Sequence, residues 1–433
     1  MAIFIPKDAG FPFDPADMHA MAEYHGFAAD VPSTDGMIAA VNSPPATPTA
    51  NSVRAAAMFD PALVQGLVPG ADFPTPDRLP NPDRSFARRG ANNLEVPVFR
   101  SDGTLWAAVP VWSFEDIATG LATWPAPAIR VREGQLVHSL LGSQQGPHTI
   151  HHHGIEPTAM NDGVGHLSFE VNAGAYTYQW QAADAGTYFY HCHRNTVLHF
   201  ERGMYGALII DPPSGPGKTY VGDALVDYGA EAIWAVDEFD TRWHGLRRDA
   251  DGNDIDYGVG PDGRVREVVD NVAAGIQGLG LNAFTTIDDP ANPRLHDFNP
   301  NVFLVSGQPG RFDSDNEILL AVGVSVRQGQ SVLVRTLNAS YAQTRWRFPS
   351  QIPGQVIAAD GRTFGKTPFG AYSSPMTLAS IGHQFQLSVA RRWDVLLDTT
   401  GVAPGQYLVD VSFHHWLTDA RLRTLRLPIT VTP

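Results

Sequence analysis

Gly186-Thr-Tyr-Phe-Tyr-His-Cys-His193 holds the only cysteine of the chain, Cys192, between two histidines. The aromatic residues and threonine that precede the cysteine are typical of a β-strand. Successive side chains of a strand point to opposite faces, so His191 and His193 share one face and Cys192 lies on the other. This single strand can therefore offer ligands to two separate sites.

The segment after this strand adds two more candidate ligands. His199 and Met204 follow Cys192 within one turn-containing stretch. A thiolate, two imidazoles and a more distant thioether form the environment that a blue electron-transfer copper prefers. A buried free cysteine beside surface histidines is the alternative interpretation. The combination of all these residues at this spacing favours the metal site.

A second histidine cluster, His148-Thr-Ile-His-His-His-Gly154, can supply the missing imidazole. By the same alternation, His151 and His153 share one face of a strand, whereas His148 lies on the opposite face. His152 faces away from His151 and His153, and we interpret it as structural or exposed.

The two clusters match face for face, so they predict two metal sites on opposite sides of one sheet. The first, a blue type 1 copper site, would be formed by His148, Cys192, His199 and Met204. The second would be formed by His151, His153, His191 and His193, which are also the candidate catalytic residues.

This order of motifs, His-x-x-His-x-His-Gly, then His-Cys-His, then His and Gly-Met, resembles the multicopper oxidases and the two-domain copper nitrite reductases. Residues 128 to 134 are similar to the first core strand of that family, and residues 161 to 163 and 176 to 178 fall where its turns and strands lie. The resemblance is strong over roughly residues 91 to 215 and weak beyond. It implies copper as the cofactor, and electron transfer from the blue copper through His191-Cys192-His193 to the coppers that reduce oxygen or nitrite.

Composition agrees with a protein of many short strands. The chain of 433 residues is long enough for two or three domains, and it has 41 glycines, 34 prolines and only 17% charged residues. A net charge of -15 argues against a nucleic-acid partner. No apolar run approaches the roughly 20 residues of a membrane span. No export signal is visible, so we expect a periplasmic or extracellular protein only if a leader has been removed, and otherwise a cytoplasmic one.

Internal repetition predicts the domain organisation. Ile129-Arg-Val-Arg-Glu-Gly-Gln135 recurs as Val324-Ser-Val-Arg-Gln-Gly-Gln330, and Ala185-Gly-Thr-Tyr188 recurs as Pro404-Gly-Gln-Tyr407. We therefore expect an all-β fold with two Greek-key cupredoxin-type β-sandwich domains. Their expected bounds are 91 to 215 for the copper-binding domain and 216 to 433 for a second, degenerate one. Residues 1 to 90 are expected to form an extended, proline-rich N-terminal arm, which carries His19 and His25.

The second copy lacks the ligands of the first. Aligning the repeats puts residues 345 to 347, Arg-Trp-Arg, at the place of the 151 to 153 histidines, and residues 410 to 412, Asp-Val-Ser, at the place of 191 to 193. A guanidinium cannot ligate a metal, so this domain cannot hold a blue copper. His414 and His415 lie close by in the sequence. The resemblance to nitrite reductases implies that the domain would give one of them as a ligand to a neighbouring subunit.

Three functions remain open. The leading hypothesis is a laccase-like multicopper oxidase that takes electrons from a small molecule or a metal ion and reduces dioxygen. A nitrite-reductase-like enzyme with one interfacial type 2 copper is the second, although His151 stands where that family has an aspartate. A non-enzymatic copper or electron-transfer protein is the third. Because the second site needs ligands from elsewhere, we expect a homo-oligomer, specifically a trimer. Isolated histidines such as His138 and His244 are interpreted as structural.

Overall fold

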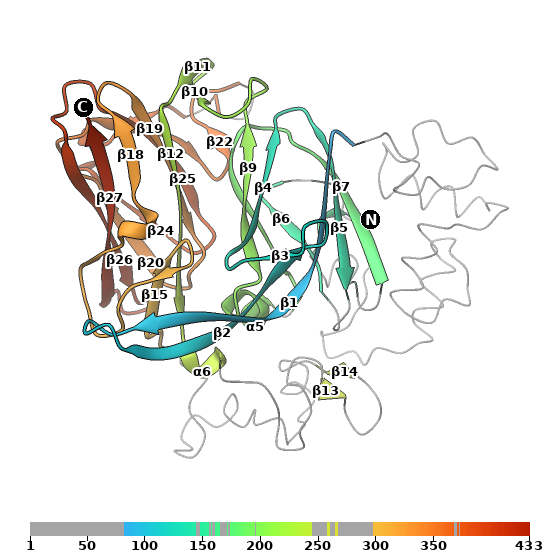
Figure 1. Cartoon of the computed structure of the whole chain (residues 1–433). Coiled ribbons are helices and arrows are strands. Elements are labelled where there is room, and N and C mark those ends of the chain that lie inside the picture. The colour runs from blue at the N-terminus through green and yellow to red at the C-terminus, as the bar shows by residue number, and fades with distance from the viewer. Residues whose placement is uncertain are drawn as a thin grey trace, which may run out of the picture.

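The structure is a computed structural model that describes residues 82–143, 148–155, 157, 161–164, 171, 174–194, 196–244, 258–259, 265–266, 298–367, 370–371 and 373–433. Its fold is all-β, as the sequence predicted, with two β-sandwiches side by side (Figure 1). Most of the expected arm, including His19 and His25, lies outside the described residues. Within them, no helix is long and apolar enough to span a membrane.

The first domain pairs two sheets, with strand orders β3-β2-β1-β5-β7 and β4-β9-β8-β6. Strand β1 begins at Arg84 and pairs with β5, so the first sheet takes in residues that the sequence analysis assigned to the arm. The elements of this domain are β1 (Arg84–Phe99), β2 (Leu105–Asp116), β3 (Leu121–Ala122), β4 (Ala126–Arg132), β5 (Leu136–Ser143), β6 (His151–His153), β7 (Gly174–Gln181), β8 (Gly186–His191), α5 (Thr196–Glu201) and β9 (Tyr205–Asp211).

The second domain also pairs two sheets, with orders β16-β15-β12-β19-β25-β21-β22 and β17-β27-β26-β20-β24. Strand β23 pairs with β21 in the first of these sheets, and β18 pairs with β27 in the second. Its principal strands are β12 (Ala230–Phe239), β15 (Val302–Val305), β18 (Val324–Arg327), β19 (Ser331–Asn338), β20 (Gln343–Arg347), β21 (Gly354–Ala359), β24 (Gln384–Leu387), β25 (Arg392–Asp398), β26 (Gly405–His414) and β27 (Arg421–Thr432).

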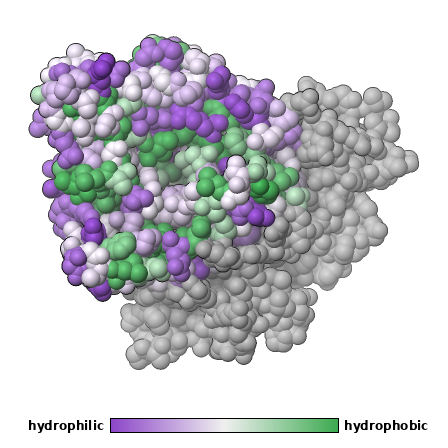
Figure 2. Space-filling view, in the orientation of Figure 1, coloured by the Kyte–Doolittle hydropathy of each residue, from purple (hydrophilic) through white to green (hydrophobic). Residues whose placement is uncertain are grey.

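Short elements complete the fold, and they are β10 (Lys218–Val221), β11 (Ala224–Asp227), α6 (Thr241–His244), β13 (Gly258–Val259), β14 (Val265–Arg266), β16 (Gln308–Pro309), β17 (Glu317–Ile318), η2 (Leu320–Val322), β22 (Arg362–Thr363), β23 (Met376–Thr377) and η3 (Ala379–Ile381). On the face shown in Figure 2, hydrophobic residues reach the surface in several separate groups among hydrophilic ones. Most apolar side chains of the strands pack inside the sandwiches. Trp234, Trp346 and Val409, for example, lie in the core of the second domain.

The repeat predicted from the sequence is present in the structure. In both domains a parallel strand pair, β1 with β5 and β12 with β19, lies in the sheet opposite the one that contains the motif strand or its counterpart. In both domains a tyrosine hydroxyl donates to the carbonyl four residues earlier, Tyr188 to Asp184 at 3.0 Å and Tyr407 to Ala403 at 2.8 Å. Such tyrosine corners recur at fixed places in β-sandwiches. They make β26 the counterpart of β8.

Strand pairing corrects one part of the repeat alignment. His191 of β8 lies opposite His151 of β6, whereas Asp410, its counterpart in β26, lies opposite Arg347 of β20. Arg347, rather than Arg345, therefore occupies the place of His151, and the alignment of this strand was wrong by two residues. The error arose because Arg-Trp-Arg imitates the alternation of His-His-His, while a strand pair is fixed by its register. The counterpart of Cys192 remains Val411, so the second domain still lacks the thiolate.

The two domains are joined by an apolar contact between their sheets. Phe189, Phe200 and Tyr205 of the first domain pack on Ala235 and Leu337 of the second. The outer face of the sheet that carries β8 is thus covered by the outer face of the sheet that carries β12 and β19. This is a head-to-tail arrangement, because unlike faces of two similar domains meet.

A buried ionic network lies beside this contact. Arg335, which is 1% exposed, binds Glu231 at 2.7 Å and Asp394 at 3.2 Å. The hydroxyl of Thr187, on β8 of the first domain, donates to Asp394 at 2.5 Å. Each buried charge has an opposite charge or a donor, which is the condition under which such groups are tolerated in an interior.

Candidate metal centre

Strand β8 and the segment after it position most of the candidate ligands. All six residues of β8 are buried, because one of its faces packs inside the first domain and the other faces the second domain. The strand ends at His191, and Cys192 follows with its amide nitrogen donating to the carbonyl of Met204 at 3.0 Å. The amide nitrogen of Met204 in turn donates to the carbonyl of His199 at 3.0 Å. The backbone thus folds the three residues around one point.

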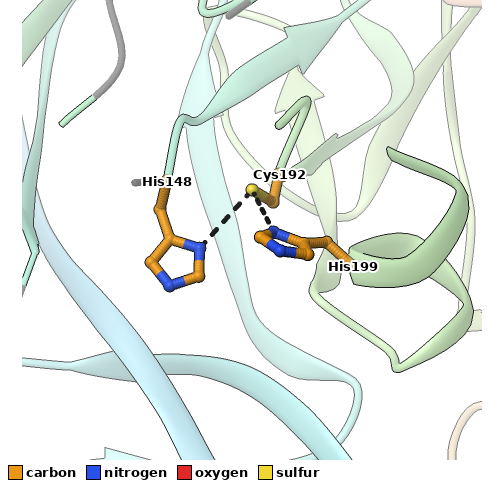
Figure 3. A group of neighbouring side chains, drawn as sticks. All are labelled: His148, Cys192 and His199. Carbon is orange, nitrogen blue, oxygen red and sulfur yellow. Dashed lines mark hydrogen bonds between the residues drawn. The ribbon is translucent and has the colours of Figure 1, made fainter. Parts of the chain in front are cut away.

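The first predicted site is assembled in the structure. The sulfur of Cys192 lies 3.1 Å from Nδ1 of His199 and 3.7 Å from Nδ1 of His148. Figure 3 shows both rings with Nδ1 directed toward this sulfur. All three side chains are buried, and their ligand atoms lie within 4.8 Å of one another. One soft thiolate and two nitrogens at these separations can hold one ion.

Met204 lies next to this trio. Its side chain is 1% exposed. A Cβ placed on Gly90 of strand β1 would lie 3.4 Å from Nε2 of His148 and 3.9 Å from Cε of Met204, so the thioether and this imidazole approach the same point of β1. The residues therefore fit a copper with a thioether as the weak fourth ligand, which is the donor set of a blue site.

Burial keeps the imidazoles of the first site neutral. It lowers the pKa of His148 to about 4, and the charge of Arg194 adds to the effect. Burial also lowers the pKa of His199 well below its ordinary value, with His148 and Arg194 as further causes. A neutral imidazole has a nitrogen lone pair free for a metal, so burial favours the form of both rings that can bind one.

The second predicted site is also assembled. Ligand atoms of His151, His153 and His191 lie within 4.8 Å of one another, with Nδ1 of His153 only 3.3 Å from Nε2 of His191. The ring of His193 is centred 5.3 Å from that of His151 and 5.5 Å from that of His191. The structure thus brings together the four histidines that the alternation of two strands predicted.

Hydrogen bonds orient two of these rings. Nδ1 of His191 donates to the carbonyl of Cys192 at 2.9 Å, and Nδ1 of His151 donates to the carbonyl of Asp162 at 2.6 Å. Each bond leaves Nε2 of the ring for a metal, which is the usual arrangement around ligating histidines. Burial is also the first cause that lowers the pKa of His153 to about 3 and that of His191 well below its ordinary value.

The other histidines that the structure describes in the first domain, or packed against it, are structural. His152 is 1% exposed, its Nε2 lies 3.1 Å from the hydroxyl of Ser139, and its ring packs on Trp180. His138 is buried on β5. The ring of His244 in α6 is buried as well, with Nδ1 donating to the carbonyl of Pro110 at 2.7 Å.

His414 and His415 do not join the cluster within one chain. His414 lies on the outer face of the second domain, where Ser412 and the carbonyl of Asp419 bind its ring at 3.0 and 3.1 Å. It lines a cavity of about 690 Å³ together with Arg345, Arg347 and Asp410. The amide nitrogens of Leu417 and Thr418 donate to Nδ1 of His415. A role of these two residues as ligands therefore requires a neighbouring copy and stays a prediction.

Sequence reasoning missed two residues beside the sites, Trp112 and Arg392. The ring of Trp112 meets that of His199 edge-on at 5.5 Å, and Arg202 lies 4.1 Å above the tryptophan. Arg392 of the second domain lies over Phe189, whose ring stacks on His153. Neither residue belongs to a motif, and both come from strands distant in sequence, so only their position in the fold identifies them.

Comparison with known proteins shows which family these residues resemble. The profile of the multicopper oxidase family matches residues 116–215. Copper resistance protein A of Escherichia coli is 28% identical over 287 residues, which cover 64% of this chain and 42% of that protein. L-ascorbate oxidase of Cucumis sativus is 36% identical over 129 residues, which cover 28% of this chain and 21% of that protein. The chain thus spans less than half the length of these curated relatives.

Solved structures support the fold. The chain aligns with the blue copper oxidase from Nitrosomonas europaea with a TM-score of 0.51 and 18% identity, over 80% of this chain and 86% of that one. It aligns with Fet3p, a multicopper oxidase that functions in iron import, with the same TM-score and identity over 80% of this chain and 52% of that one. The resemblance to the multicopper oxidase and copper nitrite reductase superfamily is therefore confirmed, and residues 116–215 match the model of the multicopper oxidase family, in which copper is the cofactor.

Proposed function

We propose that the chain is a copper-dependent oxidoreductase of the multicopper oxidase type, which takes electrons from a reducing substrate and reduces dioxygen. The observation that carries this proposal is the position of Cys192 between His191 and His193. The three residues are consecutive, and the thiol belongs to one ligand cluster while the two imidazoles belong to the other. Copper bound at the two clusters would supply one-electron redox chemistry.

The chain provides a short route between the clusters. From the sulfur of Cys192, covalent bonds run through the backbone to both neighbouring histidines. The hydrogen bond from Nδ1 of His191 to the carbonyl of Cys192, 2.9 Å long, adds a second connection. We infer that electrons enter on the His148 and His199 side and leave through His191 and His193.

Four residues would carry out the catalytic role at the second site. His151, His153, His191 and His193 are held by β6, β8 and the segment after β8, and the main-chain amide of His193 is fixed by the hydroxyl of Thr149 at 2.8 Å. Rings fixed in this way need little rearrangement during turnover. Reduction of dioxygen to two waters consumes four electrons and four protons, so the site must receive electrons repeatedly from the first cluster.

A nitrite-reductase-like enzyme is the second candidate. It is favoured by the lack of copper ligands in the second domain. That domain has Asp410, Val411 and Ser412 at the places of His191, Cys192 and His193. That domain cannot complete a site of three coppers with imidazoles of its own strand. A non-enzymatic electron-transfer protein is the third candidate, and the retention of four clustered histidines argues against it.

We propose that the partners are a small-molecule or metal-ion electron donor, dioxygen as acceptor, and further copies of this chain in a homotrimer. In the first domain, the sheet face with the histidines is covered by the second domain. The equivalent face of the second domain carries Arg345 and His414 and lines the 690 Å³ cavity. A head-to-tail contact of this kind repeats from copy to copy and can close into a ring, which supports the oligomer.

Copper stoichiometry, measured together with the oxidant that reoxidises the reduced protein, tests this function. About four coppers per chain and consumption of oxygen with an electron-rich phenol, an aromatic amine or a metal ion as donor would support the oxidase. Two coppers per chain with turnover of nitrite would select the second candidate. Only the blue copper in a fully loaded and assembled protein, with no reaction toward either oxidant, would overturn both enzymatic proposals.

A further inference from the structure

Trp112 covers one ligand of the first site. It lies on strand β2, and its ring meets the imidazole of His199 edge-on, with 5.5 Å between the ring centres and 82° between the planes. Among the residues that the structure describes, it is the only aromatic side chain, apart from the ligands themselves, whose ring contacts an imidazole of this site. It belongs to no ligand motif, and an indole does not ligate copper in the donor set of a blue site.

The ligands of the first site are sealed from solvent. The exposed fraction is 0% for Cys192 and His199, 1% for Met204 and 4% for His148. An electron donor in solution therefore finds almost no ligand surface to touch, and each electron has to cross a layer of protein. The rate of such a transfer falls steeply with the length of the gap, so the side chain that bridges ligand and surface decides where the electron enters.

Trp112 spans this layer. It is 9% exposed, which is more than any of the four ligands, so the residue reaches the solvent while its ring contacts His199. An aromatic ring in contact with a ligand shortens the gap that an electron has to cross between the surface and the imidazole. The position of Trp112 thus offers a path that buried neighbours such as Arg202, at 3% exposed, do not offer.

Contacts with the turn after α5 hold this ring in place. The main-chain nitrogen of Trp112 donates to the carbonyl of Arg202 at 2.7 Å, and the guanidinium of Arg202 lies 4.1 Å from the centre of the indole. The same turn leads to Met204, whose amide nitrogen donates to the carbonyl of His199 at 3.0 Å. A cation over the ring makes the indole harder to oxidise, because loss of an electron would create a second positive charge beside it. Trp112 is therefore suited to transmit electrons without being oxidised itself.

We infer that Trp112 is the residue through which an outer-sphere donor passes electrons to the first site, by way of His199. The inference rests on the proposed function and deepens it, because it names the point of entry and the kind of donor, one that reacts without binding to the metal or to its ligands. Each transfer moves one electron from the donor to the oxidised metal, and no bond forms or breaks. Trp112 acts through His199 and is a positioning residue.

Stopped-flow reduction of the oxidised, copper-loaded full-length protein by hexacyanoferrate(II), followed as loss of the blue absorption without oxygen, tests this inference. The cyanide shell of this donor restricts it to outer-sphere transfer, and the complex is too wide to enter the space of one indole. We expect Trp112→Leu, which removes the ring, to slow reduction at least about tenfold. Trp112→Phe keeps a smaller ring and should slow it about threefold. The reduction potential of each variant, measured by spectroelectrochemistry, corrects the rates for driving force.

Trp106→Leu is the matched control. Trp106 lies on the same strand, but its ring stacks on Phe312 at 3.8 Å, and the same substitution there should change the reduction rate less than about twofold. Reoxidation of the fully reduced protein by dioxygen takes place at the second site, so its rate should be the same in the wild type and in all of these variants. A general loss of structure would change both rates.

The outcomes separate the two proposals. If Trp112→Leu, at equal copper content and after correction for potential, is reduced as fast as the wild type or faster, the ring is only a cover and the inference is overturned alone. If this variant does not fold, an unchanged or faster reduction of Trp112→Phe overturns it equally. A copper-loaded wild type without a blue absorption would overturn the proposed function and, with it, this inference.

Discussion

Cys192 is the residue on which the first site depends most. Its sulfur lies between Nδ1 of His148 and Nδ1 of His199 and is the only thiol of the chain. We expect Cys192→Ser to abolish the intense visible absorption of the oxidised, copper-loaded protein, because a serine oxygen cannot give the thiolate charge-transfer band. Met204→Leu is the comparison variant: it should keep the colour and raise the reduction potential, because a weak donor to the oxidised ion is lost. A colourless copper-loaded wild type would contradict the assignment of a blue site.

A group of buried carboxylates gives stability a distinct pH dependence. Glu238 is 1% exposed, and burial raises its pKa to about 7. Burial, with Glu238 as the second cause, also raises the pKa of the adjacent Asp237 well above its ordinary value. The folded protein therefore holds protons that the unfolded chain has already lost, so stability should fall as pH rises from about 4.5 to 7.

Replacement of Glu238 by glutamine measures this effect. The amide keeps an oxygen that can accept from the main-chain nitrogens of Tyr341 and Ala342, as Oε1 of Glu238 does at 2.7 and 3.0 Å. The free energy of unfolding should fall between pH 5 and pH 8 in the wild type, and this fall should be about 3 kcal/mol smaller in the variant. Urea unfolding of the metal-free protein at both pH values gives the comparison, with exposed Glu95→Gln on β1 as the control. Parallel pH profiles for wild type and variant would disprove the role of Glu238.

At the scale of elements, the turn at residues 161–163 supports strand β6 and hence the second site. The carbonyl of Asp162 accepts the hydrogen bond from His151. Gly163 has a φ of 72°, and a Cβ there would lie 1.9 Å from the carbonyl oxygen of Ile150. The turn and the segment before β6 are therefore in direct backbone contact, which leaves no room for a side chain.

We expect Gly163→Ala to displace this turn and to lose copper from the second site while the blue absorption is kept. The backbone clash adds to the strain of a positive φ, so the loss of stability should exceed about 2 kcal/mol. Gly103→Ala is a matched control, because Gly103 has a φ of 85° and open space around it, and its substitution should cost about 1 kcal/mol. Copper content and thermal unfolding report both effects. Normal second-site copper in Gly163→Ala would contradict this account of the turn.

Side-chain alternation could be predicted from the sequence, whereas strand register could not. The faces of β6 and β8 were predictable because successive side chains of a strand point to opposite faces. This rule was enough to group the four histidines in one site and the trio around Cys192 in the other. The pairing of β20 with β26 was not predictable, since nothing in Arg345-Trp346-Arg347 states which residue faces Asp410. The position of Arg392 beside the second histidine cluster could not be predicted for a related reason, because the packing of the two domains brings it there.

At the scale of the whole molecule, the exposed outer sheet of the second domain bears on assembly. Its face carries Arg345 and His414, whereas the equivalent face of the first domain is covered. We expect sedimentation equilibrium to give three times the chain mass of 46.9 kDa. A reversed charge on this face, Arg345→Glu, should shift the protein toward monomers, with Lys218→Glu on β10 as a control elsewhere on the surface. A monomer with a full complement of second-site copper would show that one chain is sufficient.

The hairpin of β1 and β2 extends beyond its own sandwich. Val96 and Val98 of β1 and Val109 of β2 pack against Phe239 and Leu304 of the second domain, and Figure 1 shows the hairpin reaching along both sandwiches. Neither domain can melt without exposing part of the other. Heating the metal-free chain should therefore give a single calorimetric peak. The calorimetric and van't Hoff enthalpies of unfolding, each calculated per chain, should agree. The cooperative unit of this protein is thus the pair of domains.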